Sequence, residues 1–199
     1  MAENETTIDR LLKIRTTGRD DSNSNQFKYP YEPTPYVVLG RLANSGEITK
    51  ANTLLDYGCG KGRVDYYLAY QTRCRAIGVE YDVRIFNTAM ANHETAISRN
   101  RVTLENENAE DYEVPAEVDR CFFFNPFSVE ILAGTLGRIL ESYYENPREM
   151  YLFFYYPSDE FIGYLMGVAE LEFEDEINCQ DIFDGDNIRE QVLVFSVNG

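Results

Sequence analysis

The sequence predicts an α/β protein in which a sheet of mainly parallel strands is flanked by helices. Two observations lead to this prediction. Apolar, strand-like runs alternate with segments of helical periodicity along the chain. The first such strand ends in a turn with glycine at alternate positions, Gly58, Gly60 and Gly62, and a helical pattern opens directly after it. At 199 residues the chain is most simply one domain.

The charge narrows the range of partners. Asp and Glu number 34 against 18 Lys and Arg, which gives a formal net charge of −16. Nucleic-acid binders usually present a basic face, because phosphate neutralisation supplies most of their affinity. No cluster of Lys and Arg is visible in this sequence. The charge therefore argues against a DNA or RNA substrate and favours a small molecule or a basic protein.

The composition also predicts where the protein works. No run approaches the roughly 20 apolar residues of a membrane span, and the acidic start has no apolar signal core. The four cysteines lack Cys-x-x-Cys spacing and fall in or near strand patterns, as buried thiols in a reducing compartment do. The chain has one histidine, so no zinc site is expected. We expect a cytoplasmic protein without metal or membrane span.

The first 26 residues are set apart from the rest. Residues 1–15 carry one helical pattern, and residues 16–26 contain no apolar side chain. This second stretch is expected to be mobile, either as a lid over a ligand or as a plain connector. We therefore predict an N-terminal helix and flexible arm over 1–26 and a single domain over 27–199.

An aromatic, proline-rich segment, residues 27–36, leads into the first helix of the domain. Thr34 before Pro35 predicts the start of that helix, since a hydroxyl N-cap would be followed by proline at the first helical position. Gly46 would close it.

The glycine turn is the strongest functional signal in the chain. A strand over 53–55 ends in Asp56, and the three glycines follow. Glycine has no Cβ, so it can turn with positive φ and let a ligand touch the main chain. The free N–H groups of the next helix point into the same space. Because open α/β sheets bind ligands at the carboxyl ends of their strands, a nucleotide-type cofactor is expected here.

A second acid follows one strand–helix–strand unit later. Residues 75–80 read as a buried strand that ends in Glu80, 24 positions after Asp56. A carboxylate at this place can accept hydrogen bonds from both hydroxyls of a ribose. The alternative is that Glu80 only favours the N-terminus of the next helix, which Asp82 would cap. Tyr81 would lie along the adenine face.

The spacing of the turn selects among nucleotide motifs. The dinucleotide fingerprint has its third glycine three positions after the second, not two, and no Gly-Lys-Ser or Gly-Lys-Thr follows as in a Walker loop. Asp-x-Gly-x-Gly-x-Gly after a strand resembles the first motif of class I S-adenosylmethionine-dependent methyltransferases. The resemblance covers residues 27–199 and points to small bacterial members. It implies a Rossmann-like three-layer sandwich of seven strands, with the last antiparallel.

The same resemblance implies a cofactor, S-adenosylmethionine, with S-adenosylhomocysteine as product. In such enzymes a segment before the first strand lies against the cofactor, the first acid holds the amino group of the methionine part, and a polar turn after the third strand holds adenine. For the segment before the first strand the alternative is packing on the sheet. For the polar turn after the third strand the alternative is a solvated loop. The matching residues here are Tyr31, Thr34, Asp56, Gly58, Cys59, Gly60, Gly62, Glu80, Tyr81, Asn108, Ala109, Glu110 and Asn125.

The predicted fourth strand, residues 118–124, runs into Asn125-Pro-Phe-Ser128. Ser128 is a sound N-cap for the next helix. The segment resembles the Asn/Asp-Pro-Pro-aromatic motif of methyltransferases that act on amino groups, but it has one proline in place of two. In that motif the amide oxygen holds the amino group and stabilises its growing positive charge. Asn125 is thus expected to orient the nucleophile, with a plain Asn-Pro turn as the alternative.

Strand patterns over 150–155, 171–177 and 191–197 complete the predicted sheet. The predicted function is methyl transfer from S-adenosylmethionine to an unidentified acceptor, with an amine favoured and a small-molecule oxygen acceptor next. The alternatives are an S-adenosylmethionine-binding module without turnover and, against the glycine spacing, a nicotinamide oxidoreductase. Since the cofactor is already activated, the protein mainly supplies alignment and a dry pocket. The acceptor and the oligomeric state are not defined by the sequence.

Overall fold

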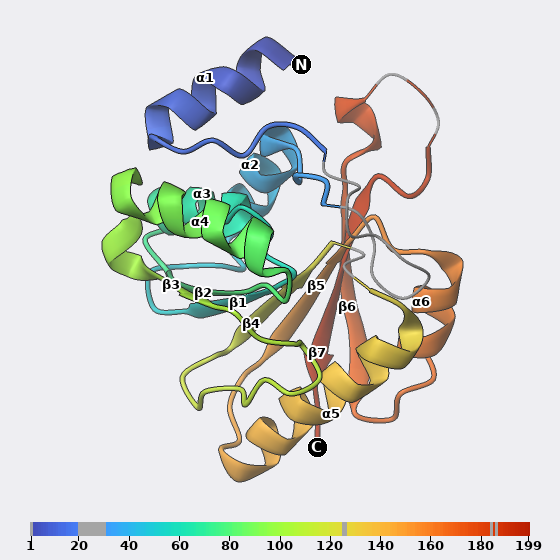
Figure 1. Ribbon diagram of the computed structural model, residues 1–199. Coiled ribbons are helices and arrows are strands. Elements are labelled where there is room, and N and C mark those ends of the chain that lie inside the picture. The colour runs from blue at the N-terminus through green and yellow to red at the C-terminus, as the bar shows by residue number, and fades with distance from the viewer. Residues whose placement is uncertain (1, 20–30, 125–126, 184, 186) are drawn as a thin grey trace.

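A computed structural model of the chain describes residues 2–19, 31–124, 127–183, 185 and 187–199. Its centre is a seven-stranded sheet in the order β3-β2-β1-β4-β5-β7-β6 (Figure 1). The strands are β1 (Thr53–Tyr57), β2 (Arg75–Val79), β3 (Val102–Glu105), β4 (Arg120–Phe123), β5 (Tyr151–Tyr155), β6 (Leu171–Asn178) and β7 (Gln191–Val197).

The strand directions agree with the sequence prediction. Strands β1 to β5 pair in parallel, and β7 is antiparallel to both of its neighbours, β5 and β6. The chain winds outward from β1 in one direction to β3 and then crosses to β4 on the other side. This reversal between β1 and β4 is the topological switch point, at whose carboxyl end α/β folds bind ligands. The predicted mostly parallel sheet with an antiparallel last strand is confirmed.

Helices cover both faces of the sheet, as the ribbon in Figure 1 shows. They are α1 (Ala2–Leu12), α2 (Tyr36–Ser45), α3 (Arg63–Gln71), α4 (Val83–Thr95), α5 (Val129–Glu145) and α6 (Asp159–Leu165), with the short 3-10 turns η1 (Arg99–Arg101) and η2 (Gln180–Ile182). Alternate residues of each strand point to opposite faces. Leu54 and Phe122 therefore join the core beneath α1 to α4, whereas Leu55 and Phe123 join the core against α5 and α6.

Three of the predicted helix boundaries are compared with the structure here. Helix α3 begins at Arg63, directly after the glycine turn, as predicted. Helix α2 begins one residue later than predicted, with Pro35 at the N-cap and no side-chain cap, so the prediction of a Thr34 hydroxyl cap is wrong. Gly46 ends that helix with φ 92°, as expected.

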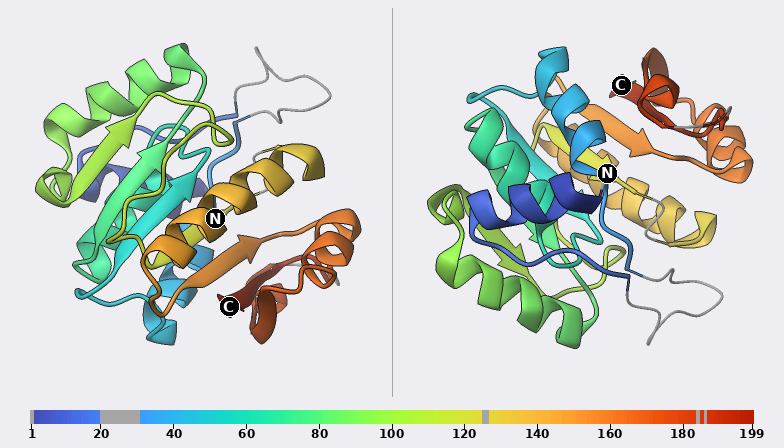
Figure 2. Two further views of the ribbon diagram at one scale, coloured as in Figure 1. Left: turned by 90° about the horizontal axis from the view of Figure 1, so that it is seen from below. Right: turned by 90° about the horizontal axis from the view of Figure 1, so that it is seen from above.

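The N-terminal segment lies over the domain. Figure 2 shows α1 lying across the outside of the helical layer that α2, α3 and α4 form. Leu12 and Ile14 enter the core on that face, and Thr16 is fully buried. Residues 16–19 begin the stretch for which we expected mobility, and at Thr16 that stretch is packed rather than exposed. Residues 20–26 lie outside the described part of the chain.

Strand β6 forms one edge of the sheet. Its side chains are mostly exposed, including Glu172, Glu174 and Glu176, and a register shift interrupts its pairing with β7. Phe173 is 45% exposed and meets the ring of Phe195 edge-on at 5.6 Å.

No helix among the described residues is long and apolar enough to cross a membrane.

Candidate functional site

The glycine turn has the backbone that its sequence predicts. Gly58, Gly60 and Gly62 all have positive φ, at 73°, 58° and 82°. The N–H groups of Gly58 and Cys59 both donate to the carbonyl of Val79, at 2.9 and 3.0 Å, which holds the turn against the end of β2. The turn therefore brings bare main chain to the carboxyl edge of the sheet.

Tyr31 lies on this turn. A Cβ on Gly60 would come within 2.3 Å of the Tyr31 ring, so only glycine allows the ring to lie so close. The Tyr31 hydroxyl donates to the carbonyl of Thr16 at 2.6 Å, and the Lys61 ammonium lies 4.6 Å from the ring centre. Gly62 is restricted in the same way by Tyr66, whose ring would be 2.6 Å from a Cβ. Tyr31 thus lies over the turn, and its contact with a cofactor stays a prediction.

Glu80 lies at the end of β2 and faces the same turn. Its side chain accepts hydrogen bonds from the N–H of Gly60 at 3.0 Å and from the N–H of Asp82 at 2.9 Å. The residue is 5% exposed. A carboxylate with about four acceptor sites is the kind of group that can accept hydrogen bonds from ribose hydroxyls. Glu80 therefore binds the N–H of Asp82 before the next helix, as the alternative interpretation expects. Its carboxylate also faces the turn, which is consistent with a bond to a ribose.

Asp56 forms a buried pair with an acid that the sequence did not single out, Asp65. Their exposed fractions are 3% and 0%, and neither forms an ion pair within the described structure. Gly78 on β2 makes room for the pair, since a Cβ there would lie 2.8 Å from the Asp65 carboxylate and from Cys59. Burial, with the neighbouring carboxylates, raises the pKa of Asp56 well above its usual range, and burial raises the pKa of Asp65 to about 7.

This pair has a chemical consequence. Two buried carboxyl groups side by side cannot both ionise without a counter-charge, so they keep a proton near neutral pH. One oxygen of Asp56, Oδ2, has no hydrogen-bond partner. Burial also raises the pKa of Cys59, so its sulfur stays a thiol. The carboxyl end of β1 is therefore acidic and suited to a positively charged group, while the described residues contain no set of three or more metal-ligating side chains.

Arg63, the first residue of α3, connects the turn to the N-terminal segment. It is 2% exposed. Its guanidinium bonds the carboxylate of Glu5 on α1, donates to the Thr16 hydroxyl at 2.7 Å and to the Thr34 carbonyl at 3.1 Å, and stacks 4.2 Å from the Tyr36 ring. Thr34, predicted to bind cofactor, is thus placed against Arg63. Sequence reasoning missed Arg63, because a single arginine at a helix start carries no sign of burial.

The three residues of the predicted adenine site have different surroundings in the structure. Asn108 is exposed and bonds Asp111 at 3.3 Å, and Ala109 packs with the core on the α5 face. The carbonyl of Glu110 accepts from Arg138 of α5 at 3.0 Å. Ala109 and Glu110 thus have contacts on the α5 side of the sheet.

Asn106 makes the link to Glu80 instead. Its side-chain amide donates to the carbonyl oxygens of Glu80, at 2.7 Å, and of Tyr81, at 3.2 Å. Tyr81 is half-buried beside it. Asn106 was visible in the sequence as the first residue of the polar turn, but nothing distinguished it from its neighbours.

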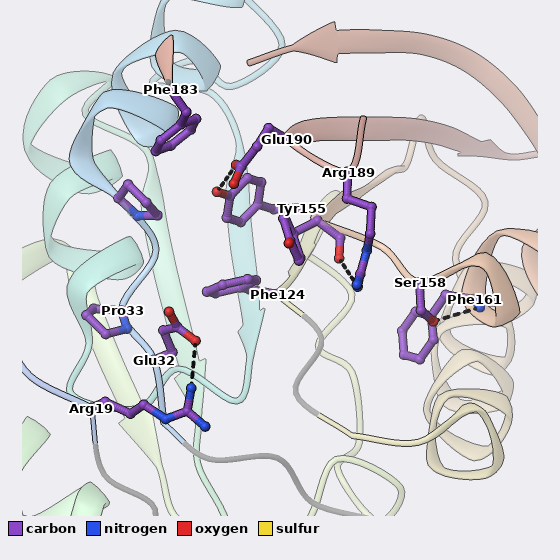
Figure 3. A pocket seen from close by; sticks show the side chains of 12 residues that line it. Arg19, Glu32, Pro33, Phe124, Tyr155, Ser158, Phe161, Phe183, Arg189 and Glu190 are labelled. Carbon is purple, nitrogen blue, oxygen red and sulfur yellow. Dashed lines mark hydrogen bonds and ion pairs between the residues drawn. The ribbon is translucent and has the colours of Figure 1, made fainter. Parts of the chain in front are cut away.

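A cavity of about 640 Å³ opens at the carboxyl ends of β4 and β5 (Figure 3). Aromatic and charged side chains line it, with Phe124 and Tyr155 in tilted contact at 4.7 Å between ring centres. The Tyr155 hydroxyl donates to Glu190 at 2.7 Å, and Arg189 lies 4.3 Å from the ring centre of Tyr156. The lining residues are Arg19, Glu32, Pro33, Pro35, Phe124, Tyr155, Tyr156, Ser158, Phe161, Phe183, Arg189 and Glu190.

The segment 31–35 connects the two places. Tyr31 covers the glycine turn, and Glu32, Pro33 and Pro35 line the cavity. Asn125, which we predict to orient the nucleophile, lies outside the described residues, and its neighbour Phe124 lines the cavity.

No family model matches this chain. A protein-lysine N-methyltransferase of Saccharolobus islandicus (strain REY15A) is 33% identical over 75 residues, which is 37% of this chain and 44% of that relative. The chain therefore matches less than half the length of this curated relative.

Two solved structures show how far the fold is shared. An RNA methyltransferase from Salinibacter ruber in complex with S-adenosyl-L-homocysteine has a TM-score of 0.57 at 18% identity, covering 84% of this chain and 94% of that one. P. horikoshii TYW2 in complex with MeSAdo has a TM-score of 0.62 at 14% identity, covering 98% and 82%. The chain thus has the Rossmann-like fold of class I S-adenosylmethionine-dependent methyltransferases, as its glycine turn predicts.

Proposed function

We propose that this protein transfers the methyl group of S-adenosylmethionine to an amine. The observation that carries the proposal is the meeting of the glycine turn and the Glu80 carboxylate at the switch point of the sheet, next to an aromatic cavity. The partial similarity to a protein-lysine N-methyltransferase and the structures with bound S-adenosylhomocysteine support it. The domain proposed to do this is residues 27–199, with residues 1–26 as its N-terminal arm.

The residues at the turn fit the cofactor. The glycines bring the main chain of the turn beneath the Tyr31 and Tyr66 rings, and the Glu80 carboxylate faces the same turn through its bond from the Gly60 N–H. Asp56 offers an unpartnered buried oxygen to the amino group of the methionine part. When bound, S-adenosylmethionine supplies a methyl group already activated by its sulfonium. The acids Asp56, Asp65 and Glu80 favour this positively charged ligand by their charge or by giving up a proton to solvent.

Gly58, Cys59, Gly60 and Gly62 would approach the cofactor through the main chain, and Tyr31 would cover it. Asn106 and Tyr81 are placed to meet the adenine end, because both lie beside the carbonyl of Glu80. Cofactor contacts by Thr34, Asn108, Ala109 and Glu110 belong to the same proposal.

The aromatic cavity suits an amine acceptor. The faces of Phe124, Tyr155 and Phe161 attract an alkylammonium group by cation–π interaction. An amine must be neutral to attack a methyl group, and a dry apolar site lowers the pKa of an ammonium. Burial and the bond to Glu190 raise the pKa of Tyr155, so Tyr155 stays a donor that holds the Glu190 carboxylate in place. Glu190 is positioned to accept the proton that the amine loses.

The net charge of the chain favours one class of acceptor over another. With a net charge of −16, a small amine or a lysine side chain of a basic protein approaches more easily than a nucleic acid. Asn125 is the residue proposed to orient that amine, and a cytoplasmic location belongs to the same proposal.

Calorimetry with S-adenosylhomocysteine tests the cofactor, and a tritiated-methyl assay over lysine peptides, small amines and small hydroxy acids tests the acceptor. We expect binding by the full chain, with a Glu80→Ala variant much weaker and the matched exposed variant Glu172→Ala unchanged. Transfer to lysine or a small amine supports the proposal. Binding without transfer over the whole panel would indicate a binding module, and label on hydroxy acids alone would indicate an O-methyltransferase.

A further inference from the structure

A second cavity, of about 470 Å³, lies at the opposite edge of the sheet, where β2 and β3 begin. Its lining is Arg75, Ile97, Ser98, Asn100 and Arg101. Parallel strands place their amino ends at one edge and their carboxyl ends at the other, so this cavity is separate from the glycine turn and from the aromatic cavity.

Four arginines gather here from two segments of the chain. The pairing of β2 with β3 sets Ala76 opposite Val102, which makes Arg75 and Arg101 neighbours at the strand starts. Arg101 also donates to the carbonyl of Arg73 at 2.9 Å. Arg99 stands two residues before Arg101 in η1. We call Arg73, Arg75, Arg99 and Arg101 the arginine cluster.

The charge of this cluster is not neutralised within the described structure. All four side chains are exposed, and none forms an ion pair with a carboxylate, whereas Arg41, Arg120 and Arg138 elsewhere do. Their hydrogen bonds go to neutral groups, such as that of Arg99 to the carbonyl of Glu94 at 2.6 Å.

The acid linked to Arg75 through Thr53 is already engaged. Arg75 donates to the Thr53 hydroxyl at 3.3 Å, and the Thr53 N–H donates to Asp119. Asp119 also accepts from Asn52 and lies 3.9 Å from Arg120. In a chain with a net charge of −16, two exposed arginines that line one cavity and two more within two residues of them, none in an ion pair among the described residues, are therefore a local positive field.

We propose that the arginine cluster binds the phosphate group of a ligand. The planar guanidinium presents a fork of N–H donors that matches phosphate oxygens, and it keeps its charge at all physiological pH values. Asn100 adds an exposed side-chain amide at the same cavity. The cavity volume lies within the range of small-ligand sites. The phosphate can belong to a small molecule or to an RNA backbone, and this proposal does not rest on the proposed methyl transfer.

The test uses the full chain and two probes. Inorganic pyrophosphate is titrated by calorimetry, and a fluorescein-labelled single-stranded RNA of about 16 nucleotides by anisotropy, at about 50 and about 200 mM salt. The variant Arg75→Gln/Arg101→Gln removes two charges from the cluster. The matched control Arg41→Gln/Arg138→Gln removes two charges from α2 and α5, and neither residue lines this cavity.

At least one probe is expected to bind saturably and to lose about 10-fold or more in affinity in the cluster variant, with the control within about twofold. Pyrophosphate alone would identify a small phosphorylated ligand. RNA binding whose salt slope falls by about 2 in the cluster variant would identify a polynucleotide. Equal loss in both variants, or no saturable binding of either probe, would overturn the proposal.

Arg101 also supports the turn at Arg73, so circular dichroism and thermal melting are recorded for every variant. Arg75→Lys/Arg101→Lys keeps the charge but removes the fork, and its affinity is expected to lie between wild type and the glutamine variant. If Arg75→Gln/Arg101→Gln does not fold, Arg75→Lys/Arg101→Lys and the single variant Arg75→Gln are judged by the same loss of affinity.

Discussion

The two ends of the sheet carry opposite charges without partners. At the carboxyl end, Asp56 and Asp65 are buried side by side with no described cation within ion-pair distance. At the amino end, the arginine cluster is exposed, and no carboxylate of the described residues lies within that distance. Elsewhere the described arginines Arg41 and Arg63 are paired in the ordinary way. The net charge of the chain therefore does not describe the local charge at either end of the sheet. Each end is complementary to a ligand of the opposite charge.

The ends also differ in what they can do when no ligand is bound. A buried carboxyl pair can take up a proton and so reduce its own charge. An exposed guanidinium cannot, because its pKa is too high. The carboxyl end should therefore respond to pH and to single substitutions, whereas the amino end should respond mainly to salt. The predictions below test this contrast, beginning with the largest expected effect.

Gly60→Ala should damage the carboxyl end most. The new Cβ would lie 2.3 Å from the Tyr31 ring, on a backbone with φ 58°. We expect loss of S-adenosylhomocysteine binding by about 100-fold or more and a loss of stability of about 1–3 kcal/mol. Calorimetry and urea denaturation measure both effects. The control is Gly163→Ala in α6, where a Cβ meets nothing within 4 Å; an equal effect there would contradict the steric argument.

Glu80→Gln should weaken the cofactor rather than the fold. The amide keeps the size of the side chain but loses the charge that accepts ribose hydroxyls and the N–H of Gly60. A hydrogen bond to a charged group contributes about 1.5–3 kcal/mol, so affinity for S-adenosylhomocysteine should fall about 10- to 100-fold. Calorimetry of Glu80→Gln beside Glu172→Gln measures it. Unchanged affinity would mean that Glu80 serves the main chain only.

Asp65→Asn should change the pH dependence of stability. Burial raises the pKa of Asp65 to about 7, so between about pH 4 and about pH 7 the native state holds a proton that the unfolded chain has lost. The free energy of unfolding of the wild type should therefore fall as pH rises through this window. The amide is neutral throughout and can donate to Asp56.

The variant should consequently be more stable than wild type at about pH 8, by about 1–2 kcal/mol, and should show a smaller slope. Urea denaturation at about pH 5 and about pH 8 measures this, with Asp111→Asn as the exposed control. A wild-type stability that rises across the window would refute the raised pKa values.

Arg75→Gln should have the smallest effect on stability. The side chain is exposed and in no ion pair, so the free energy of unfolding should change by less than about 0.5 kcal/mol. Thermal melting at low and high salt measures it. A large loss would show that the arginine cluster holds the fold together instead of facing a ligand.

Much of the fold follows from local patterns in the sequence. The alternation of strands and helices, the positive φ of the three glycines and the acid after β2 are set by residues within a few positions of one another. We predicted the N-cap of α2 at Thr34, but Pro35 is the N-cap residue. The position of the cap depends on how the preceding segment enters the helix.

The parts that the sequence did not reveal depend on distant contacts. Arg63 looks like an exposed helix start until α1 covers it, and Asp65 looks like a helix-dipole partner until Gly78 opens space beside it. The arginine cluster joins residues 26 positions apart through strand register, so no run of basic residues marks it. Burial and register arise from tertiary structure, which local periodicity does not determine.

Strand β6 affects the self-association of the protein, because it is an edge strand of the sheet. An edge strand offers unpaired N–H and C=O groups to any neighbouring chain, and natural proteins block such docking with charges and bulges. Here the alternating glutamates and the register shift supply both devices beside the half-exposed Phe173. At the isoelectric point of about 4.4 the chain has lost the net negative charge that keeps its copies apart. Precipitation in acid should then begin by strand addition at this edge.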